Sequence, residues 1–289
     1  MQLTAIPVPD GPLCALRSGS GPHTVLAAHG LTASGMSFRT VARHLPPDWR
    51  IVAVDLRGRG GSNGLPGPYG MDRHAADLAA AAEHLGTPLV LLGQSMGAYA
   101  ALRAAATRPE LFERLVLVDG GLPLPVPPGA DPDQLLAATV GPAVARLSQT
   151  YPSEQAYLDF FRAHPALSGQ WNEDLTEYVR YDIAGGPGAI RSRTNPEAVA
   201  ADGRDLIVGA ASFGEDLTRL KLPALLLYAP RGMLGQEPGM LPQPLVDHWA
   251  ALAPALRIEL VPDTNHYTIL MTDRPAELIA QRVVTSWPG

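Results

Sequence analysis

The chain contains 289 residues, a length that fits one α/β domain with an insertion as well as two domains. Hydrophobic residues make up 46% of it, and its 29 glycines and 29 prolines stay below the roughly 25–30% combined share of a low-complexity chain, so disorder is excluded. The formal net charge is −6 without any basic run, so we expect no nucleic-acid partner.

Short apolar runs rich in Val, Ile and Leu alternate with segments of helical spacing along most of the chain. Such runs are typical of strands buried on both faces of a parallel sheet. The pattern predicts strands at residues 13–17, 24–28, 50–55, 88–92, 114–118, 224–229 and 257–261, and helices at residues 38–45, 72–85, 98–107, 244–252 and 275–286. The alternation predicts an α/β fold with a doubly wound, mostly parallel sheet.

The alternation stops between Gly120 and about residue 216, where four amphipathic segments follow one another without a convincing strand. Helix starts are marked there, because Asp131 and Asn195 each precede a proline suited to the first helical position, and Ser153 can cap another segment. We therefore expect an all-helical cap over residues 122–216. The core then consists of residues 1–121 and 217–289.

The sequence Gly-Gln-Ser-Met-Gly at residues 93–97 lies between the predicted strand 88–92 and the predicted helix 98–107. A turn that lifts one serine above the end of a strand needs glycine at the flanking positions, because neighbouring backbone comes close there. Ser95 is therefore a candidate nucleophile. The start of the following helix leaves amides unpaired, so the N–H of Met96 is a candidate donor to an oxyanion.

This strand, turn and helix resemble the nucleophile turn of the α/β-hydrolase superfamily, in its serine form with a helical cap. The resemblance covers essentially the whole chain. His29-Gly30-Leu31 is similar to the family's oxyanion turn, which implies that the N–H of Leu31 is the second oxyanion donor. Residues 55–62 are similar to a structural turn of the family, Asp-x-Arg-Gly-x-Gly-x-Ser, in which we expect Asp55 and Arg57 to pair.

A further motif, Asn265-His266-Tyr267, lies between the predicted strand 257–261 and the last predicted helix, where the family keeps its general base. The resemblance implies this role for His266. A serine hydroxyl is a weak nucleophile near neutral pH, and an imidazole can take its proton and later return it to the leaving group.

The family usually places its third catalytic residue, an aspartate, in the loop after the strand that corresponds to residues 224–229. Here Gly232 occupies that position and has no side chain to orient an imidazole. Some family members hold the acid at the end of an earlier strand, and Asp119, directly after the predicted strand 114–118, is our first candidate. Its alternative role is to bind backbone amides in its own turn. Glu237, in the loop 231–241, is the alternative acid.

Eight aromatic residues fall in the predicted cap. Their side chains either fill a small core of the cap or form the roof of an apolar pocket above Ser95. Leu31, Met96 and Tyr267 surround the candidate site with apolar groups, and no basic anchor for a charged acyl group is evident. We therefore expect an uncharged or lipophilic substrate.

Together these features predict a serine hydrolase that cleaves an ester, thioester or lactone bond of a small, largely apolar molecule through Ser95, His266 and Asp119 and an acyl-enzyme. The alternatives are non-acyl chemistry on the same fold, by a carbon–carbon hydrolase or a lyase, and a hydrolase-like ligand receptor with little turnover.

The sequence has no cluster of Cys and His residues with the spacing of metal ligands, so it implies no metal. It implies no organic cofactor either. It shows neither a signal-peptide pattern nor an apolar run of about 18 residues. We therefore expect a cytoplasmic protein that binds a small-molecule substrate and no membrane. The sequence leaves the oligomeric state open.

Overall fold

Eight strands form one sheet in the computed structural model, which describes residues 1–127 and 129–285 without the side chains of residues 139, 140 and 142. The strands are β1 (Gln2–Ile6), β2 (Leu13–Ser18), β3 (His23–Ala28), β4 (Trp49–Val54), β5 (Leu89–Gln94), β6 (Phe112–Val118), β9 (Ala224–Tyr228) and β10 (Leu256–Leu260). Their spatial order is β1-β2-β4-β3-β5-β6-β9-β10. Because β2 runs antiparallel to β1 and β4 while all other neighbours are parallel, the predicted doubly wound, mostly parallel sheet is confirmed.

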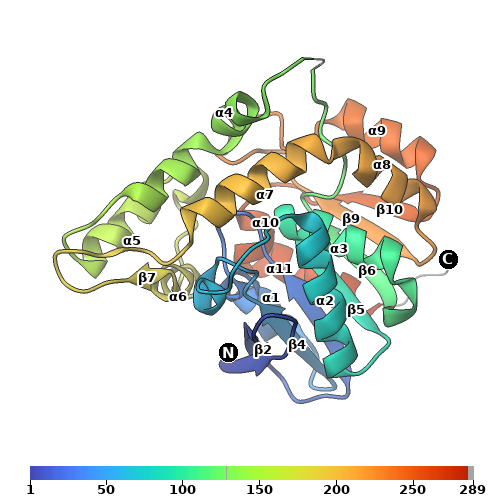
Figure 1. Ribbon diagram of the computed structural model, residues 1–289, viewed down its shortest axis with the longest axis horizontal. Coiled ribbons are helices and arrows are strands. Elements are labelled where there is room, and N and C mark those ends of the chain that lie inside the picture. The colour runs from blue at the N-terminus through green and yellow to red at the C-terminus, as the bar shows by residue number, and fades with distance from the viewer. Residues whose placement is uncertain (128, 286–289) are drawn as a thin grey trace.

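Helices cover both faces of this sheet (Figure 1). They are α1 (Arg39–His44), α2 (Met71–Leu85), α3 (Met96–Thr107), α9 (Gln243–Leu252), α10 (Thr268–Met271) and α11 (Asp273–Val284). Neighbouring residues of one strand enter different cores: Val25 packs in the cluster with α1 and α11, whereas Leu26 packs in the cluster with α2 and α3. This two-sided burial explains why the strands read as nearly continuous apolar runs.

The predicted core elements match the observed ones to within two residues at each end, although residue 286 of the last predicted helix lies outside the described residues. The sequence pattern missed β1, which pairs only with β2 at the edge of the sheet and exposes 65% of Leu3. It also missed α10, which is only four residues long. Such short or edge elements bury too few side chains to produce a clear apolar period.

The segment between β6 and β9 is mostly helical. It contains α4 (Pro132–Ala145), α5 (Glu154–Arg162), α6 (Glu173–Tyr181), α7 (Pro196–Val208) and α8 (Ala210–Arg219), and α4 and α7 lie above the core in Figure 1. The predicted caps are confirmed at Ser153 and Asn195, whose side chains accept from the amides of Ala156 and Glu197. No helix among the described residues has the length and apolar character needed to cross a bilayer.

The expectation of a strand-free insertion is wrong in one detail. Two-residue strands, β7 (Ile183–Ala184) and β8 (Arg191–Ser192), form an antiparallel pair inside it. Two residues are too few to show an alternating pattern in the sequence. At the far end, α8 runs to Arg219, past residue 216 where we placed the boundary, and it is tied to the core by an ion pair between Asp216 and Arg103 of α3.

Most aromatic side chains of the inserted segment pack against one another or against the core and do not form the roof of the pocket. Tyr151, Tyr157, Phe160 and Phe161 contact one another edge to face, and Phe161 also contacts Tyr178. Of the eight aromatic residues, only Tyr178 lines the pocket described below. The aromatic side chains in contact with one another belong to or pack against the buried cluster that also contains Val25 and Phe38 of the core, and aliphatic side chains supply most of what the insertion offers to the pocket.

The predicted pair of Asp55 with Arg57 is wrong. Arg57 is fully buried and binds the carboxylate of Asp77 in α2 through Nε and Nη2. Asp55 instead accepts from the amides of Gly35 and Gly61 and from the hydroxyl of Tyr181. The two side chains of this turn thus have different partners, and only Asp55 also binds a residue of the insertion.

Candidate active site

Ser95 lies in the tight turn between β5 and α3, at the carboxyl edge of the sheet. Its backbone has φ 53° and ψ −123°, a combination that is strained for any residue with a side chain. Glycine is required on both sides of Ser95 for the predicted steric reason. A Cβ on Gly93 would lie 2.4 Å from the carbonyl oxygen of Gly97, and one on Gly97 would lie 2.1 Å from that of Ala28. The turn therefore holds Ser95 above the strand end, partly exposed to a pocket.

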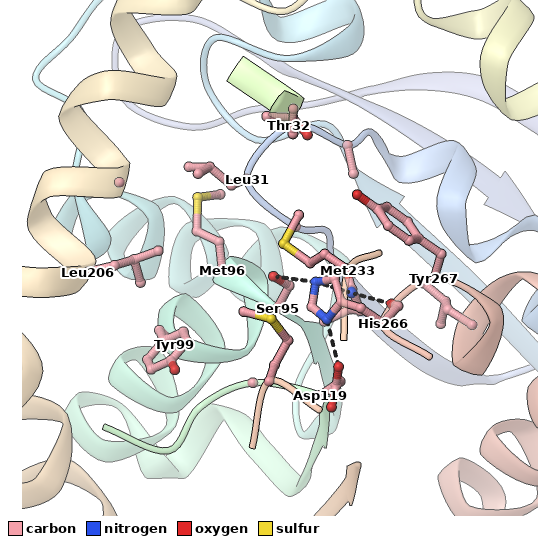
Figure 2. A pocket seen from close by; sticks show the side chains of 18 of the residues that line it. Leu31, Thr32, Ser95, Met96, Tyr99, Asp119, Leu206, Met233, His266 and Tyr267 are labelled. Carbon is pink, nitrogen blue, oxygen red and sulfur yellow. Dashed lines mark hydrogen bonds and ion pairs between the residues drawn. The ribbon is translucent and has the colours of Figure 1, made fainter. Parts of the chain in front are cut away.

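The structure brings His266 and Asp119 to Ser95, as Figure 2 shows. The Oγ of Ser95 lies 3.1 Å from Nε2 of His266, and Nδ1 of His266 lies 2.6 Å from Oδ2 of Asp119. A carboxylate only accepts, so Nδ1 carries the imidazole proton and Nε2 is free to accept from the serine hydroxyl. The three side chains thus form one continuous chain of hydrogen bonds.

Asp119 uses its two carboxylate oxygens for different partners, and neither of them is an amide of its own turn. While Oδ2 faces His266, Oδ1 accepts from the backbone amide of Ala229 at 3.0 Å. Its φ of 46° is in the left-handed region, which aspartate tolerates better than most residues, and its side chain is buried. Glu237 is exposed and does not line the pocket, so the structure does not bring this alternative acid to the imidazole.

Two side chains outside the predicted set support His266. The Nε2 of Gln94 lies 3.4 Å from the carbonyl oxygen of His266 and 3.5 Å from its Nε2. Asn265 accepts from the amides of Tyr267 and Thr268 and donates to the carbonyl of Ala166 in the insertion. The loop that carries the histidine is therefore held from both sides.

A turn over residues 30–33, hereafter the 30–33 turn, packs against Ser95. A Cβ added to Gly30 would lie 3.1 Å from Cβ of Ser95. The carbonyl of Gly30 accepts from the amide of Ala33 at 3.1 Å and from Nδ1 of His29 at 2.8 Å. In a trans peptide the N–H points opposite to the carbonyl, so these two bonds also fix the direction of the Leu31 N–H.

His29 is held in one tautomer by its two bonds. Its Nε2 accepts from the amide of Leu56 at 3.0 Å, which leaves the proton on Nδ1 for the carbonyl of Gly30. Complete burial lowers the pKa of His29 to about 3, so the ring is neutral in the folded protein at ordinary pH. His29 is thus a structural support of the 30–33 turn.

Leu31 and Met96 both line the pocket beside Ser95 (Figure 2). Met96 is the first residue of α3, where an amide has no partner within the helix. Among the described residues the structure provides no acceptor for the N–H of Leu31 or of Met96. Two unpaired amides therefore lie near the serine hydroxyl, which is the arrangement expected of an oxyanion site.

The pocket above Ser95 is apolar. The insertion contributes Leu136, Tyr178, Leu206 and Ile207, and the rest of the lining includes Tyr99, Tyr267, Leu270 and four methionines, Met96, Met233, Met240 and Met271. Apart from the tyrosine hydroxyls, its polar lining side chains are those of Thr32, Gln94, Ser95, Asp119 and His266, and no Lys or Arg belongs to the described lining. The site thus combines a polar reaction centre with an uncharged, flexible wall.

Sequence reasoning missed Gln94 and three methionines of the pocket, Met233, Met240 and Met271. Gln94 is the variable residue of the Gly-x-Ser-x-Gly motif, so its place in the motif was the available signal. Met233 and Met240 lie in the long loop after β9, where no periodic pattern indicates which side chains face inward. These residues can be identified only from the folded chain.

The chain is similar to known proteins both in sequence and in fold. A family model described as the alpha/beta hydrolase family matches residues 25–282. Over 106 residues, 36% of this chain, the identity is 39% to lipase LipV of Mycobacterium tuberculosis and 42% to N-formylmaleamate deformylase of Pseudomonas putida. Each of these matches covers 40% of the relative's own length.

A solved structure resembles the chain over nearly its full length. The crystal structure of E-2-(acetamidomethylene)succinate hydrolase superposes with a TM-score of 0.78 and covers 98% of both chains. Its sequence identity is 21%, so this likeness concerns the fold alone.

Proposed function

The chain belongs to the alpha/beta hydrolase family, and on this premise we propose that it is a serine hydrolase that cleaves the ester, thioester or lactone bond of a small, largely apolar substrate. The observation that supports the proposal most directly is the hydrogen-bonded order Ser95, His266, Asp119 at the floor of an apolar pocket. Neither a metal nor an organic cofactor enters the proposed reaction.

The reaction begins with proton transfer from Ser95 to Nε2 of His266, while Oγ attacks the acyl carbon. The carbonyl oxygen of the substrate becomes an oxyanion that accepts from the amides of Leu31 and Met96. His266 then gives the proton to the leaving group, and the acyl group stays on Ser95. Water loses a proton to His266 and attacks the acyl-enzyme, which releases the carboxylic acid and returns the proton to Ser95.

Asp119 keeps the imidazole in the tautomer that this sequence of steps needs. Its carboxylate accepts the Nδ1 proton and stabilises the imidazolium that exists after the serine has been deprotonated. The second bond of Asp119, to the amide of Ala229, fixes the orientation of the carboxylate itself. We therefore assign Asp119, rather than Glu237, as the acid.

The lining of the pocket determines the substrate class that we propose. Transfer of a carboxylate from water into an apolar pocket is costly unless a cation meets it there, and the described lining has no Lys or Arg. The relatives named above include a lipase, an enzyme that hydrolyses esters, and a deformylase, an enzyme that removes a formyl group. For this chain we infer an uncharged acyl group that contacts the methionines and the leucines of the insertion.

A fluorophosphonate probe tests the nucleophile and the acid together. We expect rapid formation of an adduct on Ser95, located by mass spectrometry, no adduct in Ser95→Ala, slow labelling in Asp119→Asn and normal labelling in Glu237→Gln. With p-nitrophenyl butyrate, a burst of p-nitrophenol equal to the enzyme concentration would support an acyl-enzyme. Absence of an adduct from folded wild-type protein would refute the proposal and favour non-acyl chemistry or a receptor.

A further inference from the structure

Two consecutive carbonyls of the 30–33 turn accept hydrogen bonds from buried arginines. The carbonyl of Leu31 accepts from Nε of Arg59 at 3.0 Å, and that of Thr32 accepts from Nη2 of Arg146 at 3.2 Å. Arg59 is fully buried, and Arg146 is 4% exposed. A buried guanidinium is costly to desolvate, so its donors must all find partners inside the protein, and in both arginines one of these partners is a carbonyl of the 30–33 turn.

Arg59 touches both residues that we propose as oxyanion donors. Besides its bond to Leu31, its Nη2 lies 3.8 Å from the sulfur of Met96, and its Nη1 donates to the carbonyl of Arg57 at 2.8 Å. The guanidinium therefore contacts the carbonyl of Leu31 and the side chain of Met96, and it is not among the hydrogen-bond partners of the serine hydroxyl or the imidazole in the described residues.

Asp202 of α7 fixes Arg59 in this position. Its carboxylate forms an ion pair with Nη1 of Arg59, accepts from Nε2 of His74 at 2.9 Å and accepts from the amide of Gly70 at 2.6 Å. Burial raises the pKa of Asp202, but His74 and Arg59 lower it overall, so the group stays ionised at neutral pH. Two further groups, His74 and the amide of Gly70, thus hold the carboxylate that anchors Arg59.

The helix that supplies Asp202 also lines the pocket. Gly203, Leu206 and Ile207 of α7 face the space above Ser95, and Gly203 is the next residue in the chain after Asp202. One element of the insertion therefore contacts the space for the acyl group and, through Asp202 and Arg59, the backbone of the 30–33 turn.

We propose that Arg59, held by Asp202, is a positioning residue. It helps to fix the two peptide groups on either side of Leu31, so that the Leu31 N–H stays directed at the developing oxyanion. This inference rests on the serine hydrolase function proposed above. The bond to the Leu31 carbonyl prevents rotation of the peptide that follows Leu31, while His29 and Ala33 hold the peptide that precedes it. The insertion is therefore required for an aligned oxyanion site as well as for binding the acyl group.

A purely structural role for the pair is the competing explanation, and the chain contains a matched control. Arg57 and Asp77 form a second fully buried ion pair only two residues away, but Arg57 donates to the carbonyls of Pro9 and Pro66 and not to the 30–33 turn. Removal of either pair takes two buried, mutually paired charges out of the protein. Only removal of the Arg59 pair frees the Leu31 carbonyl.

The experiment compares the double variants Arg59→Met/Asp202→Asn and Arg57→Met/Asp77→Asn, with Arg59→Lys as the conservative change. Both double variants remove the two charges together, so no unpaired charge stays buried. We would measure kcat and KM for p-nitrophenyl butyrate, inhibition by a trifluoromethyl ketone with the same acyl chain, and amide hydrogen exchange of the peptide that spans residues 30–33.

We expect Arg59→Met/Asp202→Asn to lower kcat by about 10²-fold with little change in KM, because an oxyanion donor acts mainly in the transition state. The ketone should lose affinity by the same factor, and exchange in residues 30–33 should become faster. Arg59→Lys, whose single ammonium cannot reach all of these partners at once, should give an intermediate kcat. The control double variant should lower the melting temperature but keep kcat and the exchange in this turn near the wild-type values.

Wild-type kcat and unchanged exchange in folded Arg59→Met/Asp202→Asn would overturn the inference, as would an equal loss of kcat in the control variant. Failure of the proposed function gives a different result: the wild type then shows no turnover and no adduct on Ser95. In that case hydrogen exchange alone still decides whether Arg59 holds the 30–33 turn.

Discussion

The carboxylate of Asp119 lies 2.6 Å from Nδ1 of His266, and it reaches this atom from the end of β6. In the sheet β6 lies between β5, which carries Ser95, and β9, with β10 and the His266 loop beyond. The imidazole must therefore extend back over the end of β9 to reach Ser95, which brings it above β6. A carboxylate at the end of β6 can bind Nδ1 directly. The hydrogen-bonded chain of Ser95, His266 and Asp119 is therefore complete although position 232 is a glycine.

Replacement of Asp119 by asparagine should lower kcat by about 10⁴-fold, because an amide in this place can hold the imidazole in the wrong tautomer. The measurement is kcat for p-nitrophenyl butyrate with purified protein of unchanged circular dichroism. Glu237→Gln serves as the control and should keep wild-type kcat, since Glu237 is exposed and outside the pocket. A large loss in Glu237→Gln combined with an active Asp119→Asn would reverse the assignment.

The fold could be predicted from the sequence because its parallel strands are buried on both faces and therefore read as apolar runs. The edge strand β1 exposes 65% of Leu3, and β7 and β8 have two residues each, so none of them produces such a run. The pairing of charged residues was harder to predict. Arg57 binds Asp77 rather than Asp55, because α2 packs next to the turn and proximity in sequence does not decide contact.

The part of the candidate site that lies at the ends of strands could be predicted from the sequence. Ser95, Asp119 and His266 each come shortly after a parallel strand, and the carboxyl ends of such strands share one edge. The supporting residues do not follow from this rule. Arg59 and Asp202 are 143 positions apart in the chain, and only the packing of α7 on the core brings them together. One sequence contains no local pattern for such a contact.

A methyl group at position 30 should disturb the reaction centre while leaving the fold intact. In Gly30→Ala the new Cβ would lie 2.8 Å from Oε1 of Gln94 and 3.1 Å from Cβ of Ser95, so the turn and the serine must separate by a few tenths of an ångström. We expect kcat to fall by about 10²-fold, as for other small misplacements of reacting groups. Gly64→Ala, whose Cβ would have no atom within 4 Å, should be fully active. Equal activities would show that the 30–33 turn tolerates displacement.

His29 should make the protein less stable in acid. Its pKa falls from 6.5 to about 3 on folding, so between these values the unfolded chain binds a proton that the folded chain does not. Titration of His29 therefore leaves the free energy of unfolding unchanged above pH 6.5. Between pH 6.5 and pH 3 it lowers this free energy as the pH falls, by at most about 1.4 kcal/mol per pH unit. Urea unfolding at several pH values should show a smaller slope for His29→Gln than for the wild type. Identical slopes would mean that His29 is protonated in the folded state.

The apolar lining should make the enzyme discriminate against anionic acyl groups. We expect kcat/KM for the mono-p-nitrophenyl ester of succinate to be lower than that for p-nitrophenyl butyrate by about 10²-fold or more, because the free carboxylate would be desolvated without a cation. Leu206→Lys places an ammonium in the pocket and should raise the succinate-to-butyrate ratio at least about tenfold. Val208→Lys is the matched control, since Val208 is on the same helix but 64% exposed, and it should leave the ratio unchanged. Comparable turnover of both esters by the wild type would contradict the proposed substrate class.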